Sequence, residues 1–149
     1  MHRIISFMLT AALGVAGLAG CADDKPSASE WAAAEVKICT RLEADRKKAA
    51  KVLPADAAPT VKQIQEFFGS FGAKFAAAVE EMKSVDRPEG MDSEIDKLEA
   101  AMDATVSSFD RISKDRSAAE AELASDGQSK VTKRLEAASS AAGLDACNA

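Results

Sequence analysis

The hydrophobic residues from position 27 onward recur at intervals of three and four, which is the spacing of one face of an α-helix. The proline residues interrupt none of these periodic segments and lie between them, where proline is best tolerated. No alternating run of β-branched or aromatic residues indicates a strand. The pattern therefore predicts an all-α fold with helices over 27–53, over 60–84, from between 88 and 92 to 124, and over 125–142.

Local sequence signals mark the ends of these helices. The segments that begin at Ser27 and Thr60 each place Glu or Gln three positions later, which is the spacing of a capping box. Gly143 follows the last predicted helix and can adopt the left-handed conformation that ends a helix, with Leu144 as its hydrophobic partner. The Asp-Gly pair at 126–127 leaves open whether the third and fourth helices are separate or form one kinked helix.

Short linkers make neighbouring helices antiparallel, so we expect an up-down-up-down four-helix bundle. The third predicted helix is the longest and should extend past the first by about two or three turns. Arg116 falls near this overhang, which would explain why it interrupts the apolar stripe of that helix. Trp31 is expected to plug one end of the bundle, and contact with a membrane interface is the alternative.

The N-terminal segment has the order of a bacterial export signal. A short positive start precedes an apolar run over 4–18, which is too short for a spanning helix of roughly 20 apolar residues. The run ends in Leu18-Ala19-Gly20-Cys21, which resembles the lipobox whose cysteine is lipidated. An ordinary cleaved signal or a short membrane anchor is the alternative. We expect a signal peptide over 1–20, a lipidated N-terminus and tether over 21–26, and a helical domain over 27–149.

Lipidation of Cys21 leaves Cys39 and Cys147 as the remaining cysteines. Export would place them in a compartment where disulfides persist, and two cysteines allow a single bridge. Two unpaired thiols are the alternative. Such a bridge would close a loop of about 109 residues and contribute about 4–5 kcal/mol in the chain-entropy model. The expected core is rich in Ala, so we expect the fold to depend on this bridge.

The composition excludes several classes of function. A net charge of −5 and a pI near 5.0 argue against nucleic-acid binding, which requires a basic surface. The single histidine, His2, lies in the leader, and the chain has no Tyr, so the mature protein lacks common general bases and metal ligands. No nucleophile motif or Gly-rich phosphate loop is present. We therefore expect no enzymatic activity, metal or cofactor.

An aromatic cluster on the second predicted helix is the most prominent apolar feature. Glycines at 69 and 72 lie within it and lower helix stability by roughly 1 kcal/mol each. The glycines could leave room for an apolar ligand beside aromatic walls, or they could allow close packing of a neighbouring helix. The candidate pocket residues are Phe67, Phe68, Phe71 and Phe75.

Charged residues form two stripes on the predicted helices. Carboxylates at 92, 96, 99, 103 and 110 follow one side of the third helix, but a straight helix cannot supply the six oxygens that a calcium ion requires. The cationic stripe could dock an acidic partner or an anionic envelope polymer, and a solvated surface is the alternative for both stripes. The candidate partner-binding residues are Lys37, Arg41, Lys48, Lys51 and Arg116.

The lipobox, the cysteine in the first helix and the closing Gly-Leu-Asp-Ala-Cys at 143–147 together resemble the small uncharacterised lipoproteins of actinobacteria. The resemblance implies lipid anchoring on the outer face of a cell membrane, or on the periplasmic side in a Gram-negative cell, and implies no activity. We expect a non-enzymatic binding or adaptor module that meets an envelope protein. The alternative is a carrier or sensor of a small apolar ligand held in the Phe-lined interior.

Overall fold

The computed structural model describes residues 25–125 and 129–148. Over these residues the chain is all-helical, as the hydrophobic pattern predicts. The predicted signal peptide over 1–20, Cys21 and the Asp-Gly pair lie outside the described residues. The helices are α1 (Ala28–Ala49), α2 (Val61–Lys83), α3 (Asp92–Lys114), α4 (Arg116–Ala124) and α5 (Lys130–Ala141), with 3₁₀ turns η1 (Ala50–Val52) and η2 (Asp145–Asn148).

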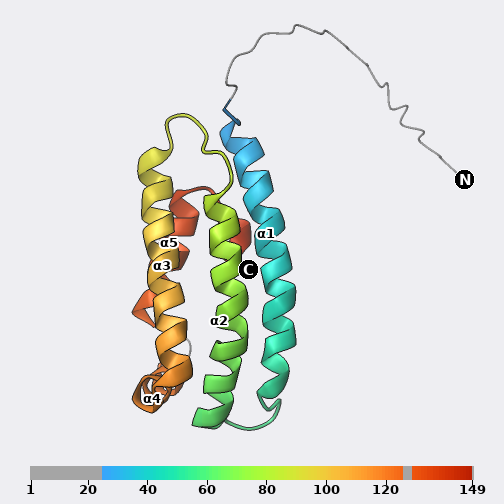
Figure 1. The fold of residues 1–149 in the computed structure, drawn as a ribbon, viewed down its shortest axis with the longest axis vertical. Helices are drawn as coiled ribbons and strands as arrows, with labels where there is room; N and C mark the ends of the chain where they lie inside the picture. The colour runs from blue at the N-terminus through green and yellow to red at the C-terminus, as the bar shows by residue number, and fades with distance from the viewer. Residues whose placement is uncertain (1–24, 126–128, 149) are drawn as a thin grey trace, which may run out of the picture.

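The three long helices α1, α2 and α3 lie side by side and alternate in direction (Figure 1). α5 packs against α3, and η2 reaches back from the end of α5 to contact α1. Among the described residues, no Cα atom of α1 lies within 8 Å of a Cα atom of α5. The side of the molecule between α1 and α5 is therefore not closed by direct packing of the two helices.

The predicted helix ends are confirmed where the signal is local. The Ser27 hydroxyl accepts a hydrogen bond from the Glu30 amide at 3.3 Å, and the Ser27 amide donates to the Glu30 carboxylate at 2.9 Å. The same reciprocal arrangement begins α2 at Thr60. Gly143 has a φ of +76°, and the Leu144 amide donates to the carbonyl of residue 139 at 2.8 Å, so a left-handed glycine ends α5 as expected.

The prediction of one long third helix that overhangs the first is wrong. The helix breaks at Asp115, whose backbone is extended (φ −107°, ψ 119°) and whose carboxylate accepts the Ser117 amide at 2.7 Å as the N-cap of α4. α4 then contacts α2 and α3, and its Ala119 is fully buried. Arg116 interrupts the apolar stripe because it is the first, exposed residue of this new helix.

The predicted start of the last helix at 125 is also wrong. α5 begins at Lys130, because the Ser129 hydroxyl accepts the Thr132 amide at 3.2 Å and makes Ser129 the N-cap. The first helix, expected to end at 53, ends at Ala49 and continues as the single turn η1.

Two hydrophobic clusters form the core. The larger one joins α1, α2, α3 and the C-terminal segment, and includes Trp31, whose exposed fraction is 2%. The indole is therefore an interior packing residue, consistent with the predicted plug. The smaller cluster lies under α4 and consists of Ile64, Phe68, Ile112 and Ala119.

The two glycines of α2 face α3 and allow the helices to approach closely. A Cβ atom on Gly72 would lie 3.2 Å from the Cβ of Phe109, whereas one on Gly69 would lie 3.7 Å from the Cβ of Ser113. Of the two interpretations of these glycines, the structure favours close helix packing.

The different space around Gly69 and Gly72 predicts that replacement of each by alanine changes stability in opposite directions. We expect Gly69→Ala to raise the free energy of unfolding by about 0.5–1 kcal/mol, because alanine favours a helix and meets an ordinary contact. Gly72→Ala should lower it, because the Phe109 Cβ is fixed to the α3 backbone and cannot move without shifting the helix. Urea denaturation of the two variants checks this, and a stabilised Gly72→Ala would contradict the packing argument.

Candidate functional site

A crevice of about 620 Å³ separates α1 from α5. Its side walls come from residues 39–47 of α1 and 132–139 of α5, and η2 contributes one end. Its volume lies within the range of small-molecule sites in proteins, about 300–1,000 Å³. Its apolar floor is supplied by α2 and α3 and consists of Phe71, Phe75, Met82, Leu98, Met102 and Phe109.

The facing sides of α1 and α5 carry mostly short or polar side chains, with Leu42 and Leu135 as the large apolar exceptions. Thr40 and Ala44 line it from α1, and Thr132 and Ser139 line it from α5. None of these side chains is large enough to fill the space between two helix axes. Beneath the opening, the floor side chains Met82 and Phe109 are partly exposed. The other four floor side chains are buried, with exposed fractions of 8% or less.

Three phenylalanine rings form a continuous part of the floor. The ring centroids of Phe71 and Phe75 are 6.1 Å apart, and both lie close to Phe109, at 5.7 Å and 5.2 Å. Of the four predicted pocket residues, Phe71 and Phe75 line the crevice, whereas Phe68 is buried in the smaller cluster and Phe67 packs against both clusters.

Phe109 is a floor residue that the sequence analysis did not select as a pocket residue. It lies on the apolar stripe of α3, opposite the aromatic cluster of α2. Pairing the phenylalanines of the two predicted helices would have identified it.

A disulfide between Cys39 and Cys147 forms one end of the crevice. The two Cα atoms are 5.4 Å apart, and both residues line the opening. The bond attaches η2 to α1, while the neighbouring Leu144 is buried in the main core. The predicted bridge therefore joins the two sides of the crevice that the helices themselves do not bring into contact.

Charged side chains lie at the rim. Arg46 donates two hydrogen bonds to the Glu43 carboxylate, at 2.5 Å and 2.7 Å, and Lys47 lies 3.4 Å from the same group. The hydrogen bond from Arg46 lowers the pKa of Glu43 to about 2. Glu136 lines the crevice from α5. The rim thus carries both signs of charge, and its two cations are already engaged by Glu43.

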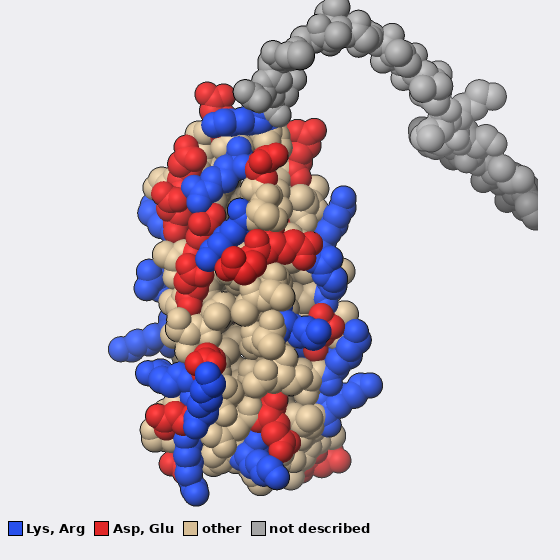
Figure 2. Space-filling view, viewed as in Figure 1, with Lys and Arg blue, Asp and Glu red and all other residues tan. Residues whose placement is uncertain are grey.

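The predicted cationic stripe follows α1, where blue side chains line one edge of the molecule (Figure 2). Arg41 pairs with Glu81 of α2, and Lys48 lies 3.2 Å from Asp45. Lys37 of α1 and Lys51 of the following turn η1 are exposed.

Arg116, the fifth residue predicted for a partner-binding surface, lies on α4. Its Nε is 2.8 Å from Glu120 of the same helix. Within the described part of the chain, α4 contacts α2 and α3 and not α1. The structure therefore does not bring Arg116 together with the cations of α1.

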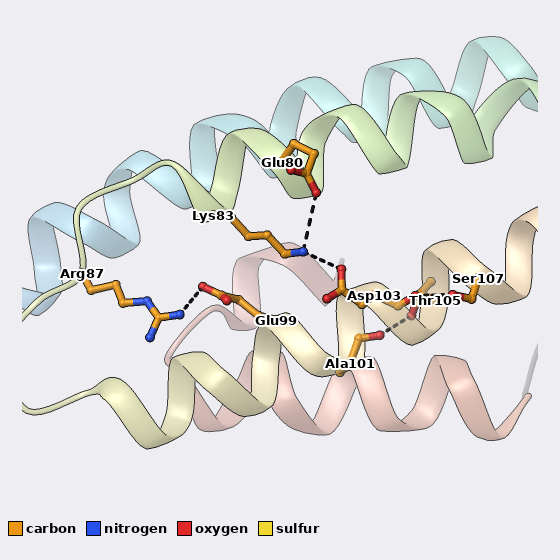
Figure 3. A network of polar contacts seen from close by, with 8 residues as sticks. All are labelled: Glu80, Lys83, Arg87, Glu99, Ala101, Asp103, Thr105 and Ser107. Carbon is orange, nitrogen blue, oxygen red and sulfur yellow. Dashed lines mark hydrogen bonds and ion pairs between the residues drawn. The ribbon is translucent and has the colours of Figure 1, made fainter.

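The acidic stripe of α3 faces cations of α2 and of the α2–α3 loop (Figure 3). Lys83 Nζ lies 2.6 Å from Asp103, and Arg87 binds Asp96 at 2.8 Å and Glu99 at 2.7 Å. These pairs connect α2 with α3. Across residues 25–125 and 129–148, no group of three or more His, Cys, Asp or Glu side chains is placed to hold a metal ion.

Glu35 of α1 is a buried carboxylate that the sequence analysis missed. Its exposed fraction is 1%, and its Oε2 atom has no hydrogen-bond partner. Burial raises the pKa of Glu35 to about 7, and the negative charges of Glu99 and Glu81 act in the same direction. The sequence does indicate that Glu35 is buried, because it lies at helical spacing between the apolar residues Trp31 and Ile38.

Comparison of the chain with protein-family models, with curated proteins and with solved structures gave no match. In the described segments, no helix combines the length and the apolar character needed to cross a membrane.

Proposed function

We propose that this protein is a non-enzymatic binding protein that holds a small apolar ligand in the crevice between α1 and α5. One observation carries the proposal: the crevice has a ligand-sized volume and an apolar, aromatic floor. Two of the floor side chains, Met82 and Phe109, are partly exposed to this space. We infer an up-down-up-down bundle of α1, α2, α3 and α5 around this site, with α4 as an added helix.

Ligand binding is favoured over docking of an envelope protein through the charged surfaces. Arg41, Lys48 and Arg116 each pair with a carboxylate of the same chain. The overhang that would have carried a docking site is replaced by α4, which packs against the molecule. An adaptor role therefore has less support than a carrier or sensor role.

Photolabelling of the full chain in lipid nanodiscs tests the proposal. We expect benzophenone or a diazirine derivative of palmitic acid to label the peptides that contain Met82 and Met102, because both side chains lie on the floor. Ala44→Trp should lower this labelling several-fold by filling the opening. Ala33→Trp is the matched control, since Ala33 is also exposed on α1 but does not line the crevice. If neither probe labels the peptides that contain Met82 and Met102, the proposal is wrong.

We further propose that the protein is anchored to the outer side of a membrane through lipid on Cys21. The support is the Leu-Ala-Gly-Cys sequence at 18–21 and the apolar run that precedes it. Two or more acyl chains hold a protein stably on a bilayer, at about 0.8 kcal/mol per buried CH₂ group. The binding site would then face the extracytoplasmic space close to the membrane.

Replacement of the lipidated residue tests the anchor. We expect wild-type protein to incorporate radiolabelled palmitate and to fractionate with membranes, and Cys21→Ala to incorporate none. Cys39→Ala is the matched control, because it removes a cysteine that lies within α1. Equal palmitate incorporation by Cys21→Ala and wild type would exclude the anchor.

A further inference from the structure

The crevice is short relative to a long acyl chain. Its walls span residues 39–47 of α1 and 132–139 of α5, which at 1.5 Å per residue are roughly 12 Å and 10 Å long. An extended 16-carbon chain, with C–C bonds of about 1.5 Å, is about 19 Å long. Such a chain would have to fold back on itself or protrude past the disulfide end.

The crevice is also wide. A volume of about 620 Å³ over roughly 12 Å of wall corresponds to a mean cross-section of about 50 Å². Carbon atoms in contact lie about 3.5–4.0 Å apart, so a single extended chain would leave part of this width unfilled. A molecule with one or more rings side by side fills a short, wide space better.

The chemistry of the floor points in the same direction. The side chains of Phe71, Phe75 and Phe109 line the crevice, and aromatic rings interact favourably with one another in offset-stacked or edge-to-face arrangements. The thioethers of Met82 and Met102 lie on the same floor, and sulfur makes favourable contacts with aromatic rings while adapting its shape.

The polar groups of the crevice do not favour an ionised headgroup. The Thr40 hydroxyl already donates to the Val36 carbonyl at 2.8 Å, and the Thr132 hydroxyl lies 3.0 Å from the Ser129 hydroxyl. The rim cations Arg46 and Lys47 bind Glu43, as described above. A carboxylate at the rim would therefore have to compete with Glu43 for these cations, and an uncharged ligand would not.

We propose that the crevice takes a compact, uncharged aromatic or polycyclic molecule in preference to a long-chain fatty acid. This inference rests on the binding function proposed above and names the ligand class of the same site.

Competition for the crevice tests the ligand class. In the full chain in nanodiscs, benzophenone labelling of the Met82 and Met102 peptides is measured with excess N-phenyl-1-naphthylamine or with excess palmitic acid. We expect the aromatic competitor to suppress the labelling at a much lower concentration than palmitic acid. Suppression by palmitic acid at lower concentration than by the aromatic competitor would overturn the ligand class and leave the binding function standing. Absence of any crevice labelling would instead overturn the binding function.

A second variant separates the aromatic contribution from the cavity itself. We expect Phe109→Leu to lower benzophenone labelling by about two- to tenfold, as expected for loss of one aromatic pair, while labelling by the diazirine derivative of palmitic acid changes less. Phe67→Leu is the control, because Phe67 stacks on Phe71 without lining the crevice. Circular dichroism confirms that both variants are helical, and equal losses for both probes in Phe109→Leu would contradict the proposal.

Discussion

Replacement of Cys39 and Cys147 by alanine is expected to lower the free energy of unfolding by about 5 kcal/mol. The bond joins residues 108 apart in sequence, so its removal frees nearly the whole domain in the unfolded state. The loss is a large fraction of the stability of a typical domain, about 5–15 kcal/mol. Urea denaturation of the double variant, compared with wild type, measures it.

The same change should also affect the crevice. No Cα atom of α1 lies within 8 Å of α5 in the described structure, and the disulfide is the covalent link between α1 and η2. We therefore expect reduction of the wild-type protein by dithiothreitol to lower both stability and crevice labelling, and to have no such effect on the double variant. If the double variant and the wild type unfold at the same urea concentration, the bond does not stabilise the fold.

Replacement of Glu35 by glutamine is expected to remove a pH dependence of stability. The carboxyl has a pKa of about 7 in the folded protein, raised by burial from an ordinary value of 4.5. Because the folded state holds the proton more tightly, the protonated form stabilises the fold below pH 4.5, and this stabilisation is lost as the pH rises through 7. The shift corresponds to about 3 kcal/mol between these limits.

Measurement of the free energy of unfolding from pH 5 to pH 8.5 tests this expectation. Glu35→Gln should match wild type at the acidic end and exceed it by up to about 3 kcal/mol at the alkaline end. The two carboxylates that act on Glu35 stay in place in this variant, Glu81 paired with Arg41 and Glu99 paired with Arg87. Glu89→Gln is the matched control, because Glu89 is exposed. Parallel curves for Glu35→Gln and wild type would show that Glu35 does not titrate in this range.

The features predicted correctly from the sequence are those decided by neighbouring residues. The capping boxes at Ser27 and Thr60 and the left-handed stop at Gly143 form hydrogen bonds within a few positions of the chain. The all-helical character follows from the three- and four-residue spacing, which is also a local property. The pairing of Cys39 with Cys147 could be predicted for a different reason. Once Cys21 is assigned to lipidation, these two cysteines remain and allow a single bridge.

The errors arose where local signals compete. The helical spacing continues through position 123 apart from Arg116, so the pattern predicted one helix. The sequence around Asp115 is compatible with a continuous helix and with a new helix capped by Asp115. Which of the two forms depends on how much apolar surface the residues after Asp115 bury in each arrangement. Packing of Ala119 against α2 and α3 decides in favour of the break.

The sequence by itself determined the helical character and the helix ends marked by Ser27, Thr60 and Gly143, because short-range hydrogen bonding and the hydrophobic period act over a few residues. Only the tertiary structure decided which phenylalanines line the crevice, that Glu35 is buried, and that α4 packs against α2 and α3. These properties depend on contacts between helices far apart along the chain. The opening between α1 and α5, on which the proposed function depends, arises from side chains of four helices and the disulfide together.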